Sequence, residues 1–466
     1  MAPESMASED LYERLERDRE RHLAELFDYL RIPSISTDPD YAKEVDRCAD
    51  WLLARMADAG LATEKIATAG HPLVYAEWNG AGPQRPTVLF YGHYDVQPPD
   101  PLEEWRHPPF EPTVEGGVLV ARGATDDKGQ SYCHLKGVEA HLAVRGKLPV
   151  NVKFLVEGEE ESGGEAIEQF VRADQGEKLA CDCVVVSDSS MFAPGVPALT
   201  YGLKGLAYFE LRVYGPNRDL HSGAFGGGVT NPANALCEIV ASIRDSRSGR
   251  VLIPGFYDEV RALADWERQE FAALGFDEEA MRVELGVDQL TGEGGYGYLE
   301  RTWARPTGDV NGLWGGYQGK GAKTVLPAWA GAKISFRLVA DQTPARIAEL
   351  LRAHVDAVKP PGVRVEIDYL HGAEAVTVDA TGAIAEAALD AMADVWGRRP
   401  VRSRTGGSIP IVGTFAQVLD VPVLLLGFGL EDDRLHSPNE KFDLANFYQG
   451  IRSVARLLDR LGEVAK

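Results

Sequence analysis

Short apolar runs that end in acidic residues or histidine are the main pattern in this chain. Four of these runs have the length and the β-branched composition of buried parallel strands, namely 87–91, 150–156, 184–186 and 421–427. Amphipathic helical patterns alternate with them, as at 42–59 and 130–142. This alternation is typical of an α/β fold, so we expect a doubly wound domain with a mixed sheet.

The pattern changes after residue 204. Alternating apolar and polar positions predict half-exposed antiparallel strands at 206–214, 332–339 and 364–370. Helical patterns separate these strands, and the resulting β-α-β-α-β order predicts a small α+β domain of the ferredoxin-like type. Between its halves we expect a long acidic helical stretch at 257–284 and a glycine-rich loop at 292–321. The predicted organisation is a first domain in two parts, with a second domain inserted between them: 1–203 and 377–466 around 204–376.

Composition narrows the classes of function. A chain of 466 residues with 44% hydrophobic content is too long for one core and too apolar for general disorder. A net charge of −23 and a pI near 4.9 argue against nucleic acids and anionic membranes as partners. We find neither a secretion signal nor an apolar run of the roughly 18 residues that a membrane helix needs. Five cysteines without a Cys-x-x-Cys pair indicate core packing and a reducing, cytoplasmic location.

Acidic and histidine side chains that could form a metal site lie in five short segments, four of which follow the predicted strands. The side chains are His93, Asp95, Asp126, Asp127, Glu160, Glu161, Asp188 and His436. Because reactive groups collect where the strands of an open α/β sheet end, these side chains can converge from distant parts of the chain. Two histidines with several carboxylates suit two divalent ions, and a water that bridges such ions is a strong nucleophile near neutral pH. The pattern predicts a two-metal hydrolase.

Each segment alone also has an ordinary explanation. His93 and Asp95 could be a loop histidine beside a surface acid, and adjacent acids such as Asp126 and Asp127 are more often simply solvated. The glutamate cluster at 157–161 is a stronger signal, because carboxylates without basic neighbours repel one another unless a cation or a proton intervenes. One of these glutamates could bind metal while its neighbour acts as a base. His436 becomes significant only as part of the whole set.

Taken together, four segments resemble the dinuclear metallopeptidase family that contains cytosolic non-specific dipeptidase, carnosinases, Cys-Gly dipeptidase, aminoacylase and glutamate-releasing carboxypeptidases. The segments are Gly92-His-Tyr-Asp-Val-Gln-Pro98, Gly123-Ala-Thr-Asp-Asp-Lys-Gly129, Glu157-Gly-Glu-Glu-Glu-Ser-Gly163 and His436-Ser-Pro-Asn-Glu440. The resemblance covers nearly the whole chain and is greatest to the dipeptidase branch. It implies a zinc-peptidase-like catalytic domain with an inserted lid and dimerisation domain.

The resemblance also implies a role for each of these positions. The ligands would be His93, Asp126 and Asp188 for one ion, and Asp126, Glu161 and His436 for the other. Asp95 would orient His93, Glu160 would be the general base, and the peptide bond between Asp126 and Asp127 would be cis. The ions would be Zn²⁺ or Mn²⁺, with Co²⁺ as a further candidate.

In the inserted domain the resemblance implies residues that contact the substrate. His221, in Asp219-Leu-His-Ser-Gly-Ala-Phe-Gly-Gly227, would reach the active site of the other subunit in a homodimer and polarise the scissile carbonyl. Arg337 would bind the C-terminal carboxylate of the substrate, assisted by Thr324 and Ser408. From the residues alone, a turn histidine at 221 and a structural salt bridge at 337 remain open alternatives.

The reaction that the resemblance implies is hydrolysis of dipeptides with a free C-terminal carboxylate by a metal-bridging hydroxide, with Glu160 as base. The same catalytic residues would serve an N-acyl amino acid deacylase or a carboxypeptidase, although the long insertion at about 257–321 favours the dipeptidase branch. A non-catalytic peptide- or metal-binding protein with this fold is an alternative from another class. The complete set of residues, including Glu160 and His221, argues against it.

Overall fold

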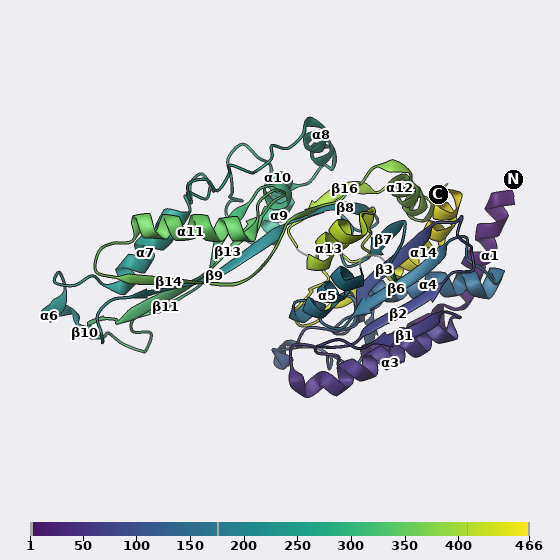
Figure 1. The fold of residues 1–466 in the computed structure, drawn as a ribbon, viewed down its shortest axis with the longest axis horizontal. Coiled ribbons are helices and arrows are strands. Elements are labelled where there is room, and N and C mark those ends of the chain that lie inside the picture. Colours follow the sequence, from purple (N-terminus) through teal and green to yellow (C-terminus); the bar gives the residue numbers. More distant parts are fainter. Residues whose placement is uncertain (1–2, 175–176, 408, 465–466) are drawn as a thin grey trace. The chain divides into compact units, whose positions relative to one another are not determined.

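The computed structural model describes residues 3–174, 177–407 and 409–464 (Figure 1). The chain divides into two compact units. The first contains Met1–Tyr201, Val378–Ser403 and Pro410–Lys466, and the second contains Gly202–Thr377 and Arg404–Ile409. None of the helices in the described part of the chain combines the length and hydropathy needed to span a bilayer.

The main sheet is mixed and, within the described residues, has nine strands. Its order is β1-β2-β6-β3-β7-β17-β8-β15, and β16 also pairs with β8. The central strands β6, β3, β7 and β17 run parallel to their neighbours in this group, whereas β2 and β8 join it antiparallel. The bounds of the nine strands are β1 Ala62–Ile66, β2 Leu73–Trp78, β3 Thr87–His93, β6 Asn151–Glu157, β7 Cys183–Val186, β8 Ala198–Leu203, β15 Val376–Thr377, β16 Val401–Thr405 and β17 Val423–Leu425.

Burial on both faces explains why the central strands are continuous apolar runs. Every residue of β6 and β7 is buried, as is every residue of β3 after Thr87. Helix α3 packs on β1 and β2, α4 packs on β3, α14 packs on α4 and α12, and α13 packs on α5 and β17. The bounds of the helices in this unit are α1 Pro3–Arg17, α2 Arg19–Leu30, α3 Ala42–Asp58, α4 Lys128–Arg145, α5 Glu165–Asp174, α12 Gly382–Trp396, α13 Pro410–Leu419 and α14 Leu444–Glu463. The predicted doubly wound mixed sheet is confirmed.

A small antiparallel sheet in the first unit joins two distant parts of the chain. It has the order β18-β5-β4, formed by β4 (Thr113–Glu115), β5 (Val118–Val120) and β18 (Lys441–Asp443). Lys441 pairs with Val120, so the segment that follows β5 and the segment that precedes β18 begin side by side.

The second unit is built on an antiparallel sheet with the order β11-β13-β9-β14. Its strands are β9 (Gly205–Tyr214), β11 (Thr307–Gly315), β13 (Trp329–Leu338) and β14 (Arg364–Ala373). Buried and half-buried positions alternate along β9, as the sequence predicts. Helices α7 (Pro232–Ile243) and α11 (Pro344–Val358) cover the apolar face, which carries Phe209 and Phe336. The predicted α+β domain is confirmed.

Short elements complete this unit. A two-stranded ribbon pairs β10 (Leu220–His221) with β12 (Val325–Leu326), and α6 (Ser222–Phe225) follows β10 directly. Figure 1 shows β10 and α6 at one end of the second unit. The region between β9 and β11 also carries α8 (Asp265–Ala273), α9 (Glu278–Glu284) and α10 (Tyr298–Ala304).

Candidate metal centre

Strand ends and the loops beside them bring the predicted acidic and histidine residues together in the first unit. His93 is the last residue of β3, and Asp188 lies two residues beyond β7. Asp126 lies between β5 and α4, and His436 lies five residues before β18. The peptide bond between Asp126 and Asp127 is cis, as expected from the resemblance.

The carboxylate of Asp126 lies between the two imidazoles. Its Oδ1 is 3.1 Å from Nε2 of His93, and its Oδ2 is 2.9 Å from Nε2 of His436. His436 Nε2 is also 3.3 Å from Oε2 of Glu161. Asp126 is almost fully buried, whereas the side chain of His436 is 57% exposed and therefore open to an incoming ligand. One carboxylate thus presents one oxygen to each histidine.

Around Asp126, two groups of side chains have the geometry to hold a metal ion. Within each group, one ligand atom from every member lies within 4.8 Å of the others. The groups are His93, Asp126 and Asp188, and Asp126, Glu161 and His436. Asp126 belongs to both, which is the arrangement by which one carboxylate holds two ions about 3.5–4 Å apart.

A third group with this geometry, Asp18, His22 and Glu139, is already neutralised by the protein. Arg21 forms salt bridges with Asp18 at 2.9 Å and with Glu139 at 2.5 Å. A guanidinium therefore fills the place of a cation there, and we assign no metal to it.

Asp95 fixes the orientation of His93. Nδ1 of His93 is hydrogen-bonded to the backbone carbonyl of Asp95 at 3.1 Å, and Oδ1 of Asp95 lies 3.3 Å from the same nitrogen. The other carboxylate oxygen of Asp95 accepts hydrogen bonds from Ser36 Oγ at 2.6 Å and from the backbone N–H of Glu161 at 3.1 Å. Nε2 of His93 consequently faces Asp126, as a histidine whose other ring nitrogen is hydrogen-bonded would face a metal. Gln97 Nε2 donates to Oε2 of Glu161 at 2.8 Å.

Sequence reasoning missed Ser36 and Gln97. Gln97 lies in the segment 92–98, four residues after His93, so its position in that segment was an available signal. Ser36 lies in a loop after α2 and carries no pattern that would have revealed its contact with Asp95.

The pKa values of the clustered side chains are consistent with a site that binds divalent cations. Burial, reinforced by the charge of Asp126, raises the pKa of Asp188 to about 7. Burial and neighbouring carboxylates likewise raise the pKa of Glu160 and of Glu161. Hydrogen bonds to Asp126 and Glu161 raise the pKa of His436 to about 10. The raised pKa values of the carboxylates reflect their burial and mutual repulsion, which bound divalent ions would relieve.

Glu160 and Glu161 are adjacent but occupy different environments. Glu161 belongs to one of the groups with metal-binding geometry, whereas neither group includes Glu160. Glu160 begins the short 3₁₀ helix Glu160–Ser162 and lines a cavity with Tyr91 and Glu157. The Tyr91 hydroxyl donates to Oε1 of Glu157 at 2.7 Å. The two neighbouring glutamates can therefore have separate roles.

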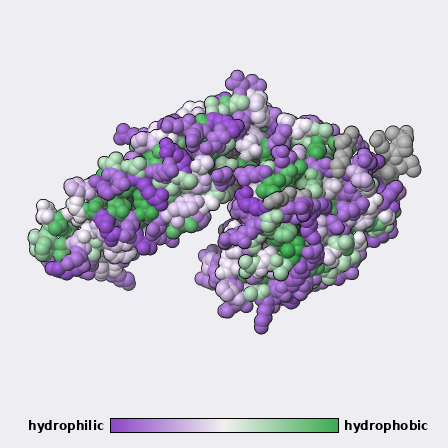
Figure 2. All heavy atoms as spheres, viewed as in Figure 1, coloured by the Kyte–Doolittle hydropathy of each residue, from purple (hydrophilic) through white to green (hydrophobic). Residues whose placement is uncertain are grey.

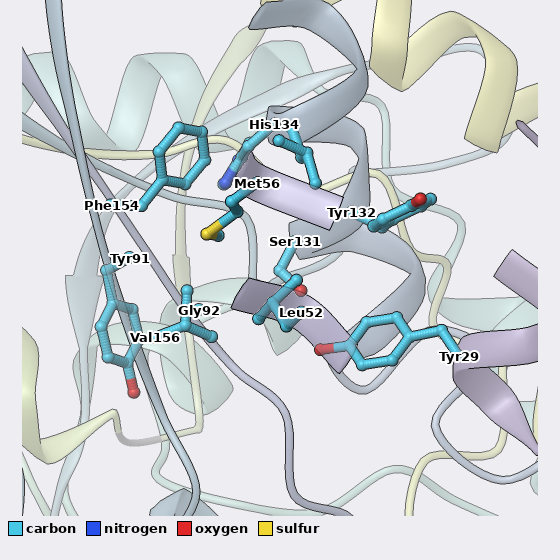
Figure 3. Close-up of a pocket in the computed structure, with 11 residues that line it drawn as sticks. Tyr29, Leu52, Met56, Tyr91, Gly92, Ser131, Tyr132, His134, Phe154 and Val156 are labelled. Atoms are coloured by element: carbon cyan, nitrogen blue, oxygen red, sulfur yellow. The ribbon is translucent and has the colours of Figure 1, made fainter. Parts of the chain in front are cut away.

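Figure 3 shows a second cavity, between β3, β6 and helices α2, α3 and α4. Its volume is about 10 Å³, enough for one water but too small for a peptide. Gly92 explains the close packing on this side of His93, since a Cβ there would lie 2.6 Å from Cβ of Ser131 and 2.8 Å from Oδ2 of Asp127. This cavity belongs to the packing behind the cluster.

The predicted substrate-contacting residues of the inserted domain lie in the second unit. The His221 ring accepts a hydrogen bond at Nδ1 from the backbone N–H of Gly223 at 3.1 Å, so a neutral ring carries its proton on Nε2. Thr324 lies beside it, because the carbonyl of Thr324 accepts a hydrogen bond from the N–H of Ser222 at 3.0 Å. Ser408 lies outside the described residues.

Arg337 lies far from His221 within the same unit. His221 pairs with Val325 in β12, which precedes β13, and Arg337 is near the far end of β13. The eight residue steps from Trp329 to Arg337 span about 26 Å at the usual rise of a strand. The structure therefore brings His221 and Thr324 together but does not bring Arg337 to them.

The fold and the side-chain cluster together define a metal-dependent hydrolase of the α/β class. The model described as Peptidase family M20/M25/M40 matches residues 89–460, and the chain belongs to this family. The family expected from the sequence motifs and the expected enzyme class, a peptide hydrolase, are both confirmed.

Similar proteins cover almost the whole chain. The chain is 33% identical over 475 residues to Cys-Gly metallodipeptidase dug1 of Schizosaccharomyces pombe, and the match covers 99% of each. It is similar to the crystal structure of human carnosine dipeptidase 1, with a TM-score of 0.85, 29% identity and coverage of 98% of this chain and 99% of that one. It is also similar to the M20 family metallo-carboxypeptidase Sso-CP2 of Sulfolobus solfataricus, with a TM-score of 0.85, 33% identity and coverage of 95% and 99%.

Proposed function

We propose that this peptidase hydrolyses dipeptides that have a free C-terminal carboxylate and that it uses a pair of divalent ions in the first unit. The observation that carries the proposal is the position of Asp126 between His93 and His436, at 3.1 and 2.9 Å. The similarity to a Cys-Gly metallodipeptidase and to human carnosine dipeptidase 1 over almost the whole chain supports a dipeptide as substrate.

The proposed ligands are His93, Asp126 and Asp188 for one ion and Asp126, Glu161 and His436 for the other. Mixed histidine and carboxylate donors suit Zn²⁺, Mn²⁺ or Co²⁺. When bound, the ions supply the Lewis-acid chemistry that makes water nucleophilic near neutral pH. In this proposal Asp95 keeps Nε2 of His93 directed at the site.

Side chains of the protein itself carry out the remaining steps. Glu160 accepts a proton from the attacking water and returns it to the leaving amine. The Nε2–H of His221 donates a hydrogen bond where negative charge develops on the scissile carbonyl oxygen. Arg337, with Thr324 and Ser408, binds the substrate carboxylate, because a guanidinium pairs with a carboxylate through two parallel hydrogen bonds.

The separation of His221 and Arg337 supports our proposal of a homodimer. An extended dipeptide is about 7 Å long, whereas β13 spans about 26 Å from Trp329 to Arg337, and His221 pairs with β12, which precedes Trp329. If both contact one substrate, one of them comes from a second copy of the chain. Phe225 and Val229, just after His221, are 43% and 40% exposed, and Figure 2 shows hydrophobic atoms at this end of the unit. We propose that this end is covered in the dimer.

The free state of all five cysteines supports our proposal of a reducing, cytoplasmic location. The high negative charge argues against nucleic acids and anionic membranes as partners.

One activity screen tests the proposed function. The protein is chelated, reconstituted separately with Zn²⁺, Mn²⁺ and Co²⁺, and assayed on dipeptides, C-terminally amidated dipeptides, N-acetyl amino acids and longer peptides. We expect turnover only after reconstitution, with free dipeptides preferred over the amidated forms by about 100-fold or more, because amidation removes the carboxylate that Arg337 would bind. A preference for N-acetyl amino acids or longer peptides would show a deacylase or a carboxypeptidase instead.

We expect divalent metal to raise the melting temperature more at about pH 8 than at about pH 5.5. The folded pKa values of Asp188, about 7, and His436, about 10, lie above their ordinary values of 3.8 and 6.5. Protonation of each group therefore stabilises the metal-free fold at low pH. That contribution is lost as the pH rises, from about 4 to 7 for Asp188 and from about 6.5 to 10 for His436. Metal binding instead requires deprotonated ligands. Thermal unfolding of the chelated protein with and without Zn²⁺ at both pH values measures the difference, and an equal or larger shift at pH 5.5 would contradict it.

A further inference from the structure

Glu440, the last residue of the segment 436–440, has no part in the proposed reaction, yet its carboxylate is bonded to the segment 122–126, which ends in the proposed ligand Asp126. It is fully buried. Its Oε1 accepts hydrogen bonds from the backbone N–H groups of Thr125 and Asp126, both at 3.0 Å. Its Oε2 accepts from the N–H of Gly123 at 2.9 Å and from the Arg122 guanidinium at 2.8 Å. Four donors from one short segment therefore converge on one carboxylate.

Further bonds join the same two segments along their length. The carbonyl of Glu440 accepts a hydrogen bond from the N–H of Ala121 at 3.1 Å, and the carbonyl of Lys441 accepts one from Oγ1 of Thr125 at 2.7 Å. Arg122, only 1% exposed, also donates to the carbonyl of Pro98 at 3.1 Å. Glu440 and Lys441 are thus fixed against the segment 121–125, which directly precedes Asp126.

The two segments carry proposed ligands of the same ion. The backbone N–H of Asp126 bonds to Glu440, while its side chain lies 2.9 Å from His436, four residues before Glu440. Because metal ligands must be held to within about half an ångström, the register between the segments matters for metal binding. We propose that Glu440 is a positioning residue that fixes Asp126 relative to His436. We call the hydrogen-bonded contact between Glu440 and the segment 122–126 the clamp. Its expected effect on metal affinity rests on the proposed function, whereas the clamp itself does not.

The four donors around residue 440 require a carboxylate at this position. An ionised glutamate is purely an acceptor, with lone pairs enough for all four donors. Glutamine has the same size and shape, but its NH₂ group would face either the Thr125 and Asp126 pair or the Gly123 and Arg122 pair without accepting from it. E440Q therefore changes the hydrogen bonding and leaves the volume unchanged, and it also removes the charge that compensates Arg122.

Amide hydrogen exchange on the metal-free protein tests the clamp without reference to metal. In E440Q we expect the backbone amides of the segment 121–127 to exchange about tenfold faster or more than in the parent, as for the loss of about one net hydrogen bond per donor. The matched control is E25Q, which alters another largely buried carboxylate in the same unit. Glu25 accepts from Lys136 at 2.5 Å, from the Tyr132 hydroxyl at 2.9 Å and from Arg21 at 2.7 Å, and none of these partners is a proposed ligand. E25Q should lower the melting temperature and leave exchange in 121–127 as in the parent.

Metal titration of the same variants by calorimetry gives the second readout. We expect E440Q to bind Zn²⁺ about 10- to 100-fold more weakly than the parent, and E25Q to bind it as the parent does. Parent-like exchange and parent-like affinity in folded E440Q would overturn the proposal. If the parent itself binds no metal, the proposed function fails, while the exchange experiment still decides whether Glu440 is a clamp. Should E440Q not fold, E440D serves instead, since it keeps the charge beside Arg122 but cannot reach all four donors. Parent-like exchange in E440D would then overturn the proposal.

Discussion

Replacing Glu160 with alanine is expected to lower kcat by about 100- to 10,000-fold while leaving metal affinity close to that of the parent. The expected loss is that of a general base removed from a site that still binds its substrate and its ions. Glu160 belongs to neither group with metal-binding geometry. Burial and the surrounding carboxylates raise its pKa, which suits a side chain that must take a proton from water near neutral pH. Steady-state kinetics and metal content, measured on one preparation, test both halves of this expectation.

The adjacent residue provides the matched control. Glu161 lies 3.3 Å from His436 and accepts a hydrogen bond from Gln97, so E161A should bind the second ion weakly and recover some activity in excess metal. E160A should recover none, because metal cannot replace a missing base. If E160A instead lost metal while E161A kept it, the roles of the two glutamates would be reversed. Parent-like turnover in E160A would refute the base assignment.

The first unit and its cluster could be predicted because burial leaves a clear signal in sequence. Strands β3, β6 and β7 are buried on both faces, so their residues form continuous apolar runs, and polar residues at their ends stand out against them. The structure brings together His93, Asp126, Glu161, Asp188 and His436 as the motifs predict. The predicted strand at 421–427 is shorter, since β17 covers only Val423–Leu425. Val421 and Pro422 before it are only half-buried, whereas Leu426 after it is buried and donates a backbone hydrogen bond to Val186 at 2.8 Å.

The contacts around the ligands could be predicted much less well. Ser36 bonds to Asp95 across 59 positions of sequence, and a serine in a loop has no periodicity to indicate such a partner. Glu440 could be recognised as part of a motif, but its four donors lie more than 310 positions earlier in the chain. Such bonds depend on which loops the fold places side by side, and no local pattern encodes that.

The second unit contains the largest differences from the sequence expectations. The expected glycine-rich loop at 292–321 includes the edge strand β11, Thr307–Gly315. Its glycines concealed it, although Gly308 packs closely there, since a Cβ would lie 3.0 Å from the ring of Phe336. The expected acidic helical stretch at 257–284 is divided into α8 and α9 by a turn at Gly275, whose φ of 62° is left-handed. Local composition favoured a loop and one continuous helical stretch. Instead, packing against β13 forms the strand β11, and Gly275 separates α8 from α9.

Replacing His221 with alanine is expected to lower kcat by about 100- to 1000-fold, the usual effect of removing a donor to a developing oxyanion. Nδ1 of His221 already accepts from Gly223, so Nε2 is the nitrogen free to donate to substrate. H221A should therefore bind both ions as the parent does and have a similar KM. The matched control is H354A, which alters another histidine of the same unit. His354 bonds to Ser242 at 2.8 Å and is not a proposed site residue, so H354A should keep parent activity.

Mixing two inactive variants determines which subunit supplies His221. Glu160 and the proposed ligands belong to one unit of one chain, so E160A inactivates the site of its own subunit. If His221 acts across the dimer, a mixed dimer of H221A and E160A has one complete site, with Glu160 from the first chain and His221 from the second. After subunit exchange at equal concentrations, about half of the dimers are mixed, and about a quarter of the parent activity should return. Donation within one chain predicts no recovery, because neither chain then supplies a complete site. The distance between His221 and Arg337 in one chain favours recovery, since a dipeptide cannot span the strand that separates them.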